Sequence, residues 1–202
     1  MAKEKSLEVL IEAHKKICEK EKNINLLFIG DGPEIDDYKA LVKKLKITKN
    51  VMFTGKIPWE EVPAYYQACD LFASASTSET QGVTVIEAMA AEAAPICIND
   101  QSFTTTVTDG VNGRIFKTQD EYADIVLELY KDRKQLAKLQ KQARIDAEKH
   151  SAKYYGESVY EVYKRAVKNK DYDNYGVIGK IVEKIKEGKN ETRSRKSKNV
   201  SK

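Results

Sequence analysis

The sequence contains few of the side chains that build metal centres or disulfide frameworks. Its 202 residues include only three cysteines and two histidines. The cysteines, Cys18, Cys69 and Cys97, lie inside apolar patterns without a CxxC spacing, so we expect reduced, buried thiols in a cytoplasmic protein. His14 falls on an apolar helical stripe and His150 beside a helix boundary, and neither has a second ligand nearby in the sequence. These features argue against a zinc site and a disulfide framework, and we expect no metal or other cofactor.

Long hydrophobic runs are also absent. No apolar run approaches the roughly 20 residues that a membrane-spanning helix needs. The first residues, MAKEKSLEVLIEAHKK, are charged and amphipathic, which is not typical of a signal peptide. With 41% hydrophobic residues, the chain can bury one sizeable core, as one domain with a tail or as two small domains. We expect a cytoplasmic globular protein, with peripheral contact at the inner face of the cell membrane as an option.

Positive charge is concentrated near the end of the chain. Residues 153–202 hold 14 Lys and Arg against 7 Asp and Glu, and the whole chain carries only +4, so the preceding part is net acidic. The last stretch, KEGKNETRSRKSKNVSK, lacks apolar periodicity and predicts a solvated, flexible tail. An alternative is an adaptor function, in which this tail contacts an anionic membrane or a nucleic acid. Because no aromatic residue interrupts the run, we expect no nucleic-acid partner.

Two periodicities alternate along the body of the chain. Short, continuously apolar segments predict buried strands at 25–30, 51–55, 70–75 and 95–99. Amphipathic segments between them predict helices at 7–18, 35–45, 59–69 and 83–92. Apolar strands separated by helices indicate a parallel sheet covered on both faces, which is a Rossmann-like, doubly wound α/β fold.

A short strand and three helices are expected after this alternation. Asn112 and Gly113 precede the strand, and the helices fall near 119–131, 133–147 and 151–168. We therefore predict one domain over 1–168, followed by an amphipathic helix and the basic tail within 169–202. Tyr155, Tyr160 and Tyr163 follow helical spacing and are expected in a core or an interface.

The loops that follow the strands are the candidate binding segments. In a doubly wound sheet, ligands bind outside the carboxyl ends of the strands. Three loops qualify, at 30–33, 55–58 and 74–82. The first, GDGP, does not satisfy GxGxxG and predicts only a strand-ending turn. The third, SASTSETQG, is long and polar for such a connection, which favours a function in binding.

Two glutamates flank the start of the helix after this third loop. The free N–H groups and the dipole of a helix starting near Val83 favour an anion such as a pyrophosphate, and Gly82 lets it approach the backbone. Glu87, one turn into the helix, can accept two hydrogen bonds from a ribose diol. Glu79 would face the other end of the ligand, where a sugar fits. The alternative is that one glutamate stabilises the helix dipole and the other is a solvated surface residue.

The segment 78–95, SETQGVTVIEAMAAEAAP, resembles the Glu-x7-Glu signature of the retaining glycosyltransferases of family 4, also called group 1. These enzymes have a two-domain GT-B fold, and the likeness covers about residues 4–165, as the C-terminal half of that fold. Within the family, ASTSETQGVTVIEAMAA is most similar to bacterial diacylglycerol glucosyltransferases, which use UDP-glucose. Other segments agree in the order of the family: FIGDGPE at 28–34, VMFTGKIP at 51–58, residues 70–75, EAMAAEAAP at 87–95 and DGVNGRIF at 109–116.

The resemblance implies roles for the two glutamates and the loop between them. Glu87 would bind the ribose hydroxyls. Glu79, with the backbone of Gln81 and Gly82, would bind the donor sugar. Family members are thought to substitute at the front face, where the leaving phosphate helps to deprotonate the acceptor.

The resemblance also implies where the rest of the donor binds. The N–H groups of Val83 and Thr84 would contact the diphosphate, and Lys5 matches a lysine that family members place on it. The segment around Lys56 and Ile57 would line the uracil. A lysine and a helix N-terminus can stabilise the departing diphosphate without a metal, so Lys5 and Glu79 are the expected catalytic residues.

The sequence departs from the family pattern in two ways. Family members have most of another Rossmann-like domain before this segment, and an arginine that usually precedes the Lys5 motif is absent. The resemblance therefore implies a truncated chain without the acceptor domain, which binds nucleotide sugar weakly and transfers little. The other departure is Ala93, where the family usually has glycine.

Alternative functions remain open from the sequence. One is a retaining glycosyltransferase that acts on a cell-wall or capsule polysaccharide precursor. Another is a non-catalytic nucleotide-binding module of Rossmann type, which would respond to NAD or FMN. A UDP-sugar epimerase of the same fold is disfavoured, because the further acid and base residues that it needs are not found.

Overall fold

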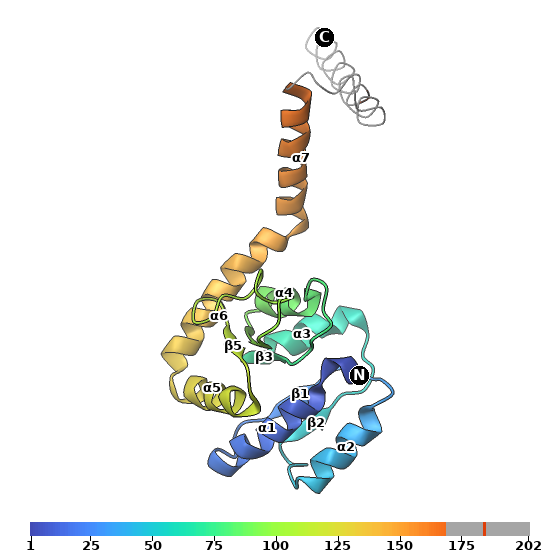
Figure 1. The fold of residues 1–202 in the computed structure, drawn as a ribbon, viewed down its shortest axis with the longest axis vertical. Helices are drawn as coiled ribbons and strands as arrows, with labels where there is room; N and C mark the ends of the chain where they lie inside the picture. The colour runs from blue at the N-terminus through green and yellow to red at the C-terminus, as the bar shows by residue number, and fades with distance from the viewer. Residues whose placement is uncertain (169–183, 185–202) are drawn as a thin grey trace, which may run out of the picture. The chain divides into compact units, whose positions relative to one another are not determined.

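The computed structural model describes residues 1–168 and residue 184 (Figure 1). The chain divides into two compact units, Met1–His150 and Ser151–Lys202, and each is described by itself. The predicted boundary at 168 stays a prediction, since the residues that follow it lie, apart from Lys184, outside the described part. The same holds for the amphipathic helix and the basic tail that are expected within 169–202.

The first unit alternates helices and strands in the order that the sequence predicts. Its first half contains η1 (Lys3–Lys5), α1 (Leu7–Lys20), β1 (Leu26–Phe28), α2 (Ile35–Lys44) and β2 (Val51–Phe53). Its second half contains η2 (Trp59–Glu61), α3 (Val62–Gln67), β3 (Leu71–Ser74), α4 (Val83–Ala90), β4 (Ala94–Ile98), β5 (Arg114–Phe116), α5 (Gln119–Lys131), α6 (Arg133–Ala147) and η3 (Glu148–His150).

The strand pairs in the described part of the chain are all parallel, as expected for a doubly wound fold. β1 pairs with β2, with Leu26 opposite Val51, and β4 pairs with both β3 and β5. The described strands form these two ladders instead of one hydrogen-bonded sheet. β1, β2 and β3 are shorter than their apolar segments, whereas β4 has the predicted length but begins one residue earlier. One reason is that Gly30 and Gly55 have φ of +110° and +69°, so the backbone leaves the extended conformation there.

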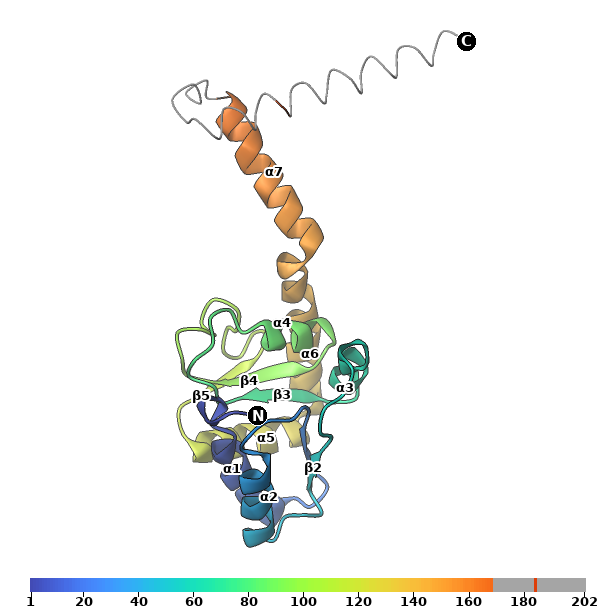
Figure 2. The same ribbon diagram turned by 90° about the vertical axis from the view of Figure 1, so that its right-hand side faces the viewer.

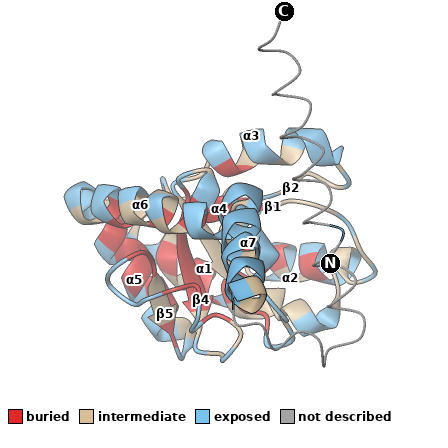
Figure 3. Ribbon diagram, turned by 90° about the horizontal axis from the view of Figure 1, so that it is seen from above, coloured by how far each residue is buried: buried red, intermediate tan, exposed pale blue. Residues whose placement is uncertain are grey.

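Helices cover both faces of the β3–β4–β5 ladder (Figure 2). One core cluster joins side chains of α1 and α5 to Ala94 and Ile96 of β4. A second cluster joins α4 and α6 to Cys97 of the same strand. Successive residues of β4 therefore face opposite layers, and the strand is buried from Ala94 to Cys97 (Figure 3). This explains why its sequence is apolar without alternation.

Side-chain caps account for the starts of the late helices. The Thr118 hydroxyl accepts a hydrogen bond from the Glu121 N–H at 3.2 Å, which caps α5. Asp132 accepts from the Gln135 N–H at 2.9 Å and caps α6 in the same way. These caps place the two helices over the residues that their periodicity predicts.

The cysteines are free, but they are less uniformly buried than expected. Cys97 is buried in β4, whereas Cys18 and Cys69 are only partly buried. Burial raises the pKa of the Cys97 thiol to about 12. Cys18 lies at the edge of the α1 stripe and Cys69 follows α3 in a turn, so neither is enclosed from all sides.

The second unit contains α7 (Ala152–Lys168), which has no buried residue. The Ser151 hydroxyl accepts a hydrogen bond from the Tyr154 N–H at 3.2 Å and caps the helix. Tyr155, Tyr160 and Tyr163 are 70%, 45% and 38% exposed, so the expectation of a core position is wrong, and a position in an interface stays a prediction. Helical spacing showed that these tyrosines share one face of α7, but it did not show whether other residues cover that face. No helix among the described residues is both long and apolar enough to cross a membrane.

Candidate functional site

The candidate site lies where β3 ends and α4 begins. The connection between Ser74 and Val83 is the long polar loop that the sequence singled out. Gly82 ends this loop with φ of +58° and is buried, and a Cβ there would lie 3.2 Å from the Phe103 ring. No side chain among the described residues caps α4, and Val83 and Thr84, whose N–H groups have no partner within the helix, are exposed residues. The start of α4 can therefore accept an anion.

Lys5 contacts Glu79 directly. The Lys5 Nζ donates a hydrogen bond to the Glu79 Oε1 and forms an ion pair with it, although 74 positions separate them. The side chain of Glu79 is 19% exposed and that of Lys5 is 42% exposed. The hydrogen bond from Lys5 lowers the pKa of Glu79, burial opposes this, and the Ser76 hydroxyl adds to the lowering. Glu79 is therefore ionised at neutral pH.

Ser76 joins the N-terminal segment to the loop. It is 1% exposed, and its hydroxyl donates a hydrogen bond to the backbone carbonyl of Glu4 at 3.5 Å. The contact brings η1, which carries Lys5, against the residues that precede Glu79. Because Ser76 is one of several serines and threonines in a polar loop, the sequence did not distinguish it as the buried one.

Glu87 lies in the second turn of α4 and is exposed, but one oxygen of its carboxylate has a partner. The Tyr66 hydroxyl donates a hydrogen bond to Glu87 Oε2 at 3.3 Å. Tyr66 is 8% exposed and packs edge-on against Phe72, with ring centroids 5.7 Å apart. The sequence pattern did not show the contact between Tyr66 and Glu87. Burial, and then the charge of Glu87, raise the pKa of the Tyr66 hydroxyl, so it stays protonated and donates.

The loop after β2 lies beside the loop after β1. The Gly30 N–H donates to the Gly55 carbonyl at 3.1 Å, which links two of the three predicted loops. Lys56 is exposed, Ile57 is half-buried, and Trp59 is 78% exposed. Among the described residues, no hydrogen bond or ion pair joins Lys56 or Ile57 to the glutamates, so their place in the site stays a prediction.

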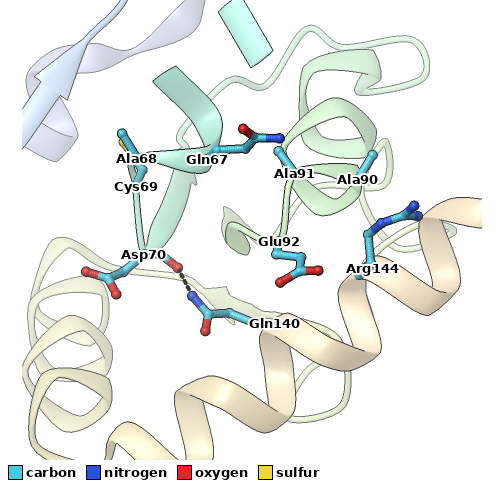
Figure 4. Close-up of a pocket in the computed structure, with 9 residues that line it drawn as sticks. All are labelled: Gln67, Ala68, Cys69, Asp70, Ala90, Ala91, Glu92, Gln140 and Arg144. Carbon is cyan, nitrogen blue, oxygen red and sulfur yellow. Dashed lines mark hydrogen bonds between the residues drawn. The ribbon is translucent and has the colours of Figure 1, made fainter. Parts of the chain in front are cut away.

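A polar cavity of about 580 Å³ lies elsewhere, between the ends of α3 and α4 and the side of α6 (Figure 4). Asp70 and Glu92 line it, and the Gln140 Nε2 donates to the Asp70 carbonyl at 3.0 Å. These residues precede β3 and β4, so the cavity is at the amino ends of the strands. None of the predicted site residues lines it, and the candidate site is at the opposite edge.

The predicted absence of a metal is not tested by the structure. No group of three or more His, Cys, Asp or Glu side chains gathers with metal-binding geometry in the part of the chain that is described. Through its contact with Glu79, Lys5 brings an ammonium group to the loop that leads into the N-terminus of α4.

Comparison with known proteins identifies the family of the chain. The family model "Glycosyl transferases group 1" matches residues 1–146. The chain belongs to the group 1 glycosyl transferases. This confirms the family that the Glu-x7-Glu segment indicates.

The relatives among curated proteins include two glycolipid synthases. The chain is 34% identical over 163 residues to an alpha-monoglucosyldiacylglycerol synthase of Acholeplasma laidlawii, covering 81% of this chain and 41% of that protein. It is also 34% identical over 125 residues to a protein of the same name from Streptococcus pneumoniae, covering 62% of this chain and 28% of that protein. The chain thus spans less than half the length of these group 1 relatives.

Solved glycosyltransferase structures share the fold. Anabaena HepE, crystallised with UDP and glucose, superposes with a TM-score of 0.73 at 21% sequence identity. The superposition covers 82% of this chain and 46% of HepE. The prediction of a Rossmann-like half of a GT-B fold is therefore confirmed.

Proposed function

We propose that this chain is the donor-binding half of a retaining glycosyltransferase that transfers glucose from UDP-glucose to diacylglycerol. The contact between Lys5 and Glu79, in the loop that leads into α4, is the observation that carries the proposal, because it brings a cation and an ionised acid to the segment before a helix N-terminus. The UDP and glucose bound to HepE support a nucleotide-sugar donor. The names of the two relatives that are 34% identical support the lipid acceptor.

Each group has a defined task in the proposed reaction. The N–H groups of Val83 and Thr84 bind the diphosphate together with Lys5. Glu87 binds the ribose hydroxyls, and Glu79 holds the hexose, with the backbone of Gln81 and Gly82 as further contacts. Lys56 and Ile57 line the base.

The chemistry breaks the bond between the sugar anomeric carbon and the phosphate oxygen. Negative charge grows on the departing UDP, and the Lys5 ammonium and the start of α4 stabilise it without a metal. The acceptor hydroxyl bonds to the same face of the sugar, and its proton passes to the leaving phosphate. Retention of configuration follows from this same-face substitution.

In this proposal, binding of the acceptor and transfer of the sugar require the whole protein. Because the chain matches less than half of its relatives' length, we expect it alone to bind donor weakly and to transfer little sugar. An acceptor in a membrane would place the whole protein peripherally at the inner face of the cell membrane. Transfer to a cell-wall or capsule polysaccharide precursor is the alternative for the same donor site.

Calorimetric titration with UDP and UDP-glucose tests the donor site. We expect measurable binding by the wild-type chain, and loss of at least tenfold in affinity in Glu87→Ala, because the diol then lacks its acceptor. Lys5→Ala should weaken binding to a similar extent through the diphosphate. Lys3→Ala and Glu92→Ala are matched controls, since Lys3 is exposed on the same short helix and Glu92 lines the cavity at the other edge.

Two results would overturn the proposal. If the wild-type chain binds NAD or FMN and neither UDP ligand, it is a dinucleotide- or flavin-binding module instead. If the two control substitutions weaken UDP binding as much as Glu87→Ala does, the ligand lies away from the start of α4. Transfer of labelled glucose to diacylglycerol by the whole protein would test the acceptor.

A further inference from the structure

The carboxylate of Glu87, on α4, is hydrogen-bonded to a residue of the neighbouring helix α3. It lies on the exposed side of α4, where a glutamate side chain ordinarily samples several rotamers. In the structure its Oε2 accepts the hydrogen bond from the Tyr66 hydroxyl at 3.3 Å. The carboxylate therefore has one oxygen directed toward α3, while Oε1 has no partner among the described residues.

Tyr66 is itself fixed in place. Its ring packs edge-on against Phe72 and belongs to a buried cluster with Ala88 and Ala93, which flank the end of α4. The helix that carries it, α3, has Pro63 in its first turn, which restricts the backbone there. A buried ring on a constrained helix gives its hydroxyl a defined position, so the contact orients the glutamate more than it orients the tyrosine.

We propose that Tyr66 is a positioning residue, which holds the carboxylate of Glu87 in the orientation that recognises the two ribose hydroxyls of the nucleotide. The inference rests on the proposed donor site. Tyr66 does not itself touch the ligand in this arrangement, since its hydroxyl points to Glu87.

The hydrogen-bonding capacity of the two groups is consistent with this role. An ionised carboxylate has about four acceptor sites, and Tyr66 occupies one of them. The remaining sites on Oε1 and Oε2 are enough to accept one hydrogen bond from each hydroxyl of a vicinal diol. Recognition of a diol requires both oxygens to face it together, so fixing one oxygen fixes the plane of the pair.

The test compares two ligands in one variant. Tyr66→Phe keeps the ring and removes only the hydroxyl. Calorimetry with the full chain should show UDP binding weakened about fivefold, the effect of one hydrogen bond of ordinary net strength. Binding of 2′,3′-dideoxy-UDP, which lacks the diol, should not change. The same substitution in a Glu87→Ala background should have no further effect on UDP.

Tyr65→Phe is the matched control. Tyr65 lies on the same helix, is only partly buried, and has no hydrogen-bond partner among the described residues. We expect its substitution to leave the affinity for both ligands unchanged. The ratio of the two affinities does not depend on the folded fraction of a variant, so a loss of stability in Tyr66→Phe cannot imitate the expected result.

Each other outcome has a distinct meaning. Equal weakening of UDP and dideoxy-UDP would overturn the inference, because Tyr66 would then act on the fold of the site and not on the diol. Unchanged binding of both ligands would overturn it as well, with the proposed function intact. A wild-type chain that fails to bind UDP would overturn the proposed function, and the inference with it.

Discussion

His14 is a buried residue whose charge state is coupled to folding. It is 2% exposed on α1, and its Nε2 has no hydrogen-bond partner among the described residues. Burial lowers its pKa from the ordinary value of 6.5, against a smaller opposing effect of the backbone at Asn50 and Ile24. Its burial agrees with its place on the apolar stripe of α1.

The lowered pKa of His14 predicts a pH dependence of stability. The folded chain binds fewer protons than the unfolded chain in this range, so stability is fully present above pH 6.5 and decreases as the pH falls toward the lowered folded pKa. Urea unfolding between about pH 7.5 and about pH 5 should show this decrease, and His14→Leu should flatten it. The exposed His150 is the control, because His150→Gln should leave the slope unchanged. An unaltered slope in His14→Leu would contradict the prediction.

Asn112 is a second residue whose role only the structure reveals. It is 3% exposed, accepts a hydrogen bond from the Thr108 N–H at 2.7 Å, and donates to the Thr106 carbonyl at 3.1 Å and to Asp146 Oδ2 at 3.0 Å. From the sequence, the Asn-Gly pair indicated only a turn before a strand. In the structure, the Asn112 side chain also joins the loop before β5 to α6.

Removing the Asn112 side chain should destabilise the first unit. Asn112→Ala leaves buried partners unsatisfied, so we expect a loss of about 2 kcal/mol in the free energy of unfolding. Asn99→Ala, at an exposed position, should change it by less than about 0.5 kcal/mol. Urea denaturation of both variants measures the difference. Similar values for the two would show that the network contributes little.

At the scale of elements, two helices end with the same motif and an unusual residue. α2 ends with the Ile47 N–H bonded to the Val42 carbonyl, and Lys46 has φ of +58°. α4 ends with the Ala93 N–H bonded to the Ala88 carbonyl, and Glu92 has φ of +65°. Both are Schellman motifs, in which glycine is usual at the left-handed position. In α4 the left-handed residue is thus Glu92, one position before Ala93, where the sequence departs from the family pattern.

A glycine at the left-handed position of α2 should stabilise the chain. Lys46→Gly relieves a conformation that is unfavourable for side-chain residues, partly offset by the greater freedom of glycine in the unfolded state, for a net gain of about 0.5–1 kcal/mol. Lys44→Gly, within the last turn of the same helix, should instead lose about 1 kcal/mol. Thermal unfolding compares the two. A loss of stability in Lys46→Gly would contradict the prediction.

The existence and type of the elements followed well from the sequence, but their ends did not. Helices α5 and α6 match the predicted residues because Thr118 and Asp132 supply local caps. β1, β2 and β3 are shorter than their apolar segments because apolar residues also fill the core beyond the last ladder hydrogen bond. Ala75, for example, is fully buried but lies outside β3.

At the scale of the whole molecule, the first unit has its own core. Its four buried clusters are built from residues within Met1–His150, and the family match ends at 146. Every residue proposed to bind donor lies in this unit. The first unit therefore contains both its own hydrophobic core and all residues of the proposed donor site.

We expect the first unit to fold and bind donor without the second. A chain that ends after His150 should bind UDP with an affinity within about twofold of the full chain, as calorimetry can measure, because independent units contribute additively. A cooperative unfolding transition of the shortened chain is the control for its folding. A large loss of affinity in a folded, shortened chain would show that residues after 150 take part in donor binding.

Local order along the chain determined which elements form and which loop carries the two glutamates. Alternating apolar strands and amphipathic helices imply a parallel sheet, and a parallel sheet places its strand-to-helix loops at one edge. Only the tertiary structure decided that Lys5 pairs with Glu79 and that Tyr66 holds Glu87. Those contacts join positions 74 and 21 residues apart. Periodicity reports the environment of a residue but not its partner, so contacts at such separations depend on how the helices pack.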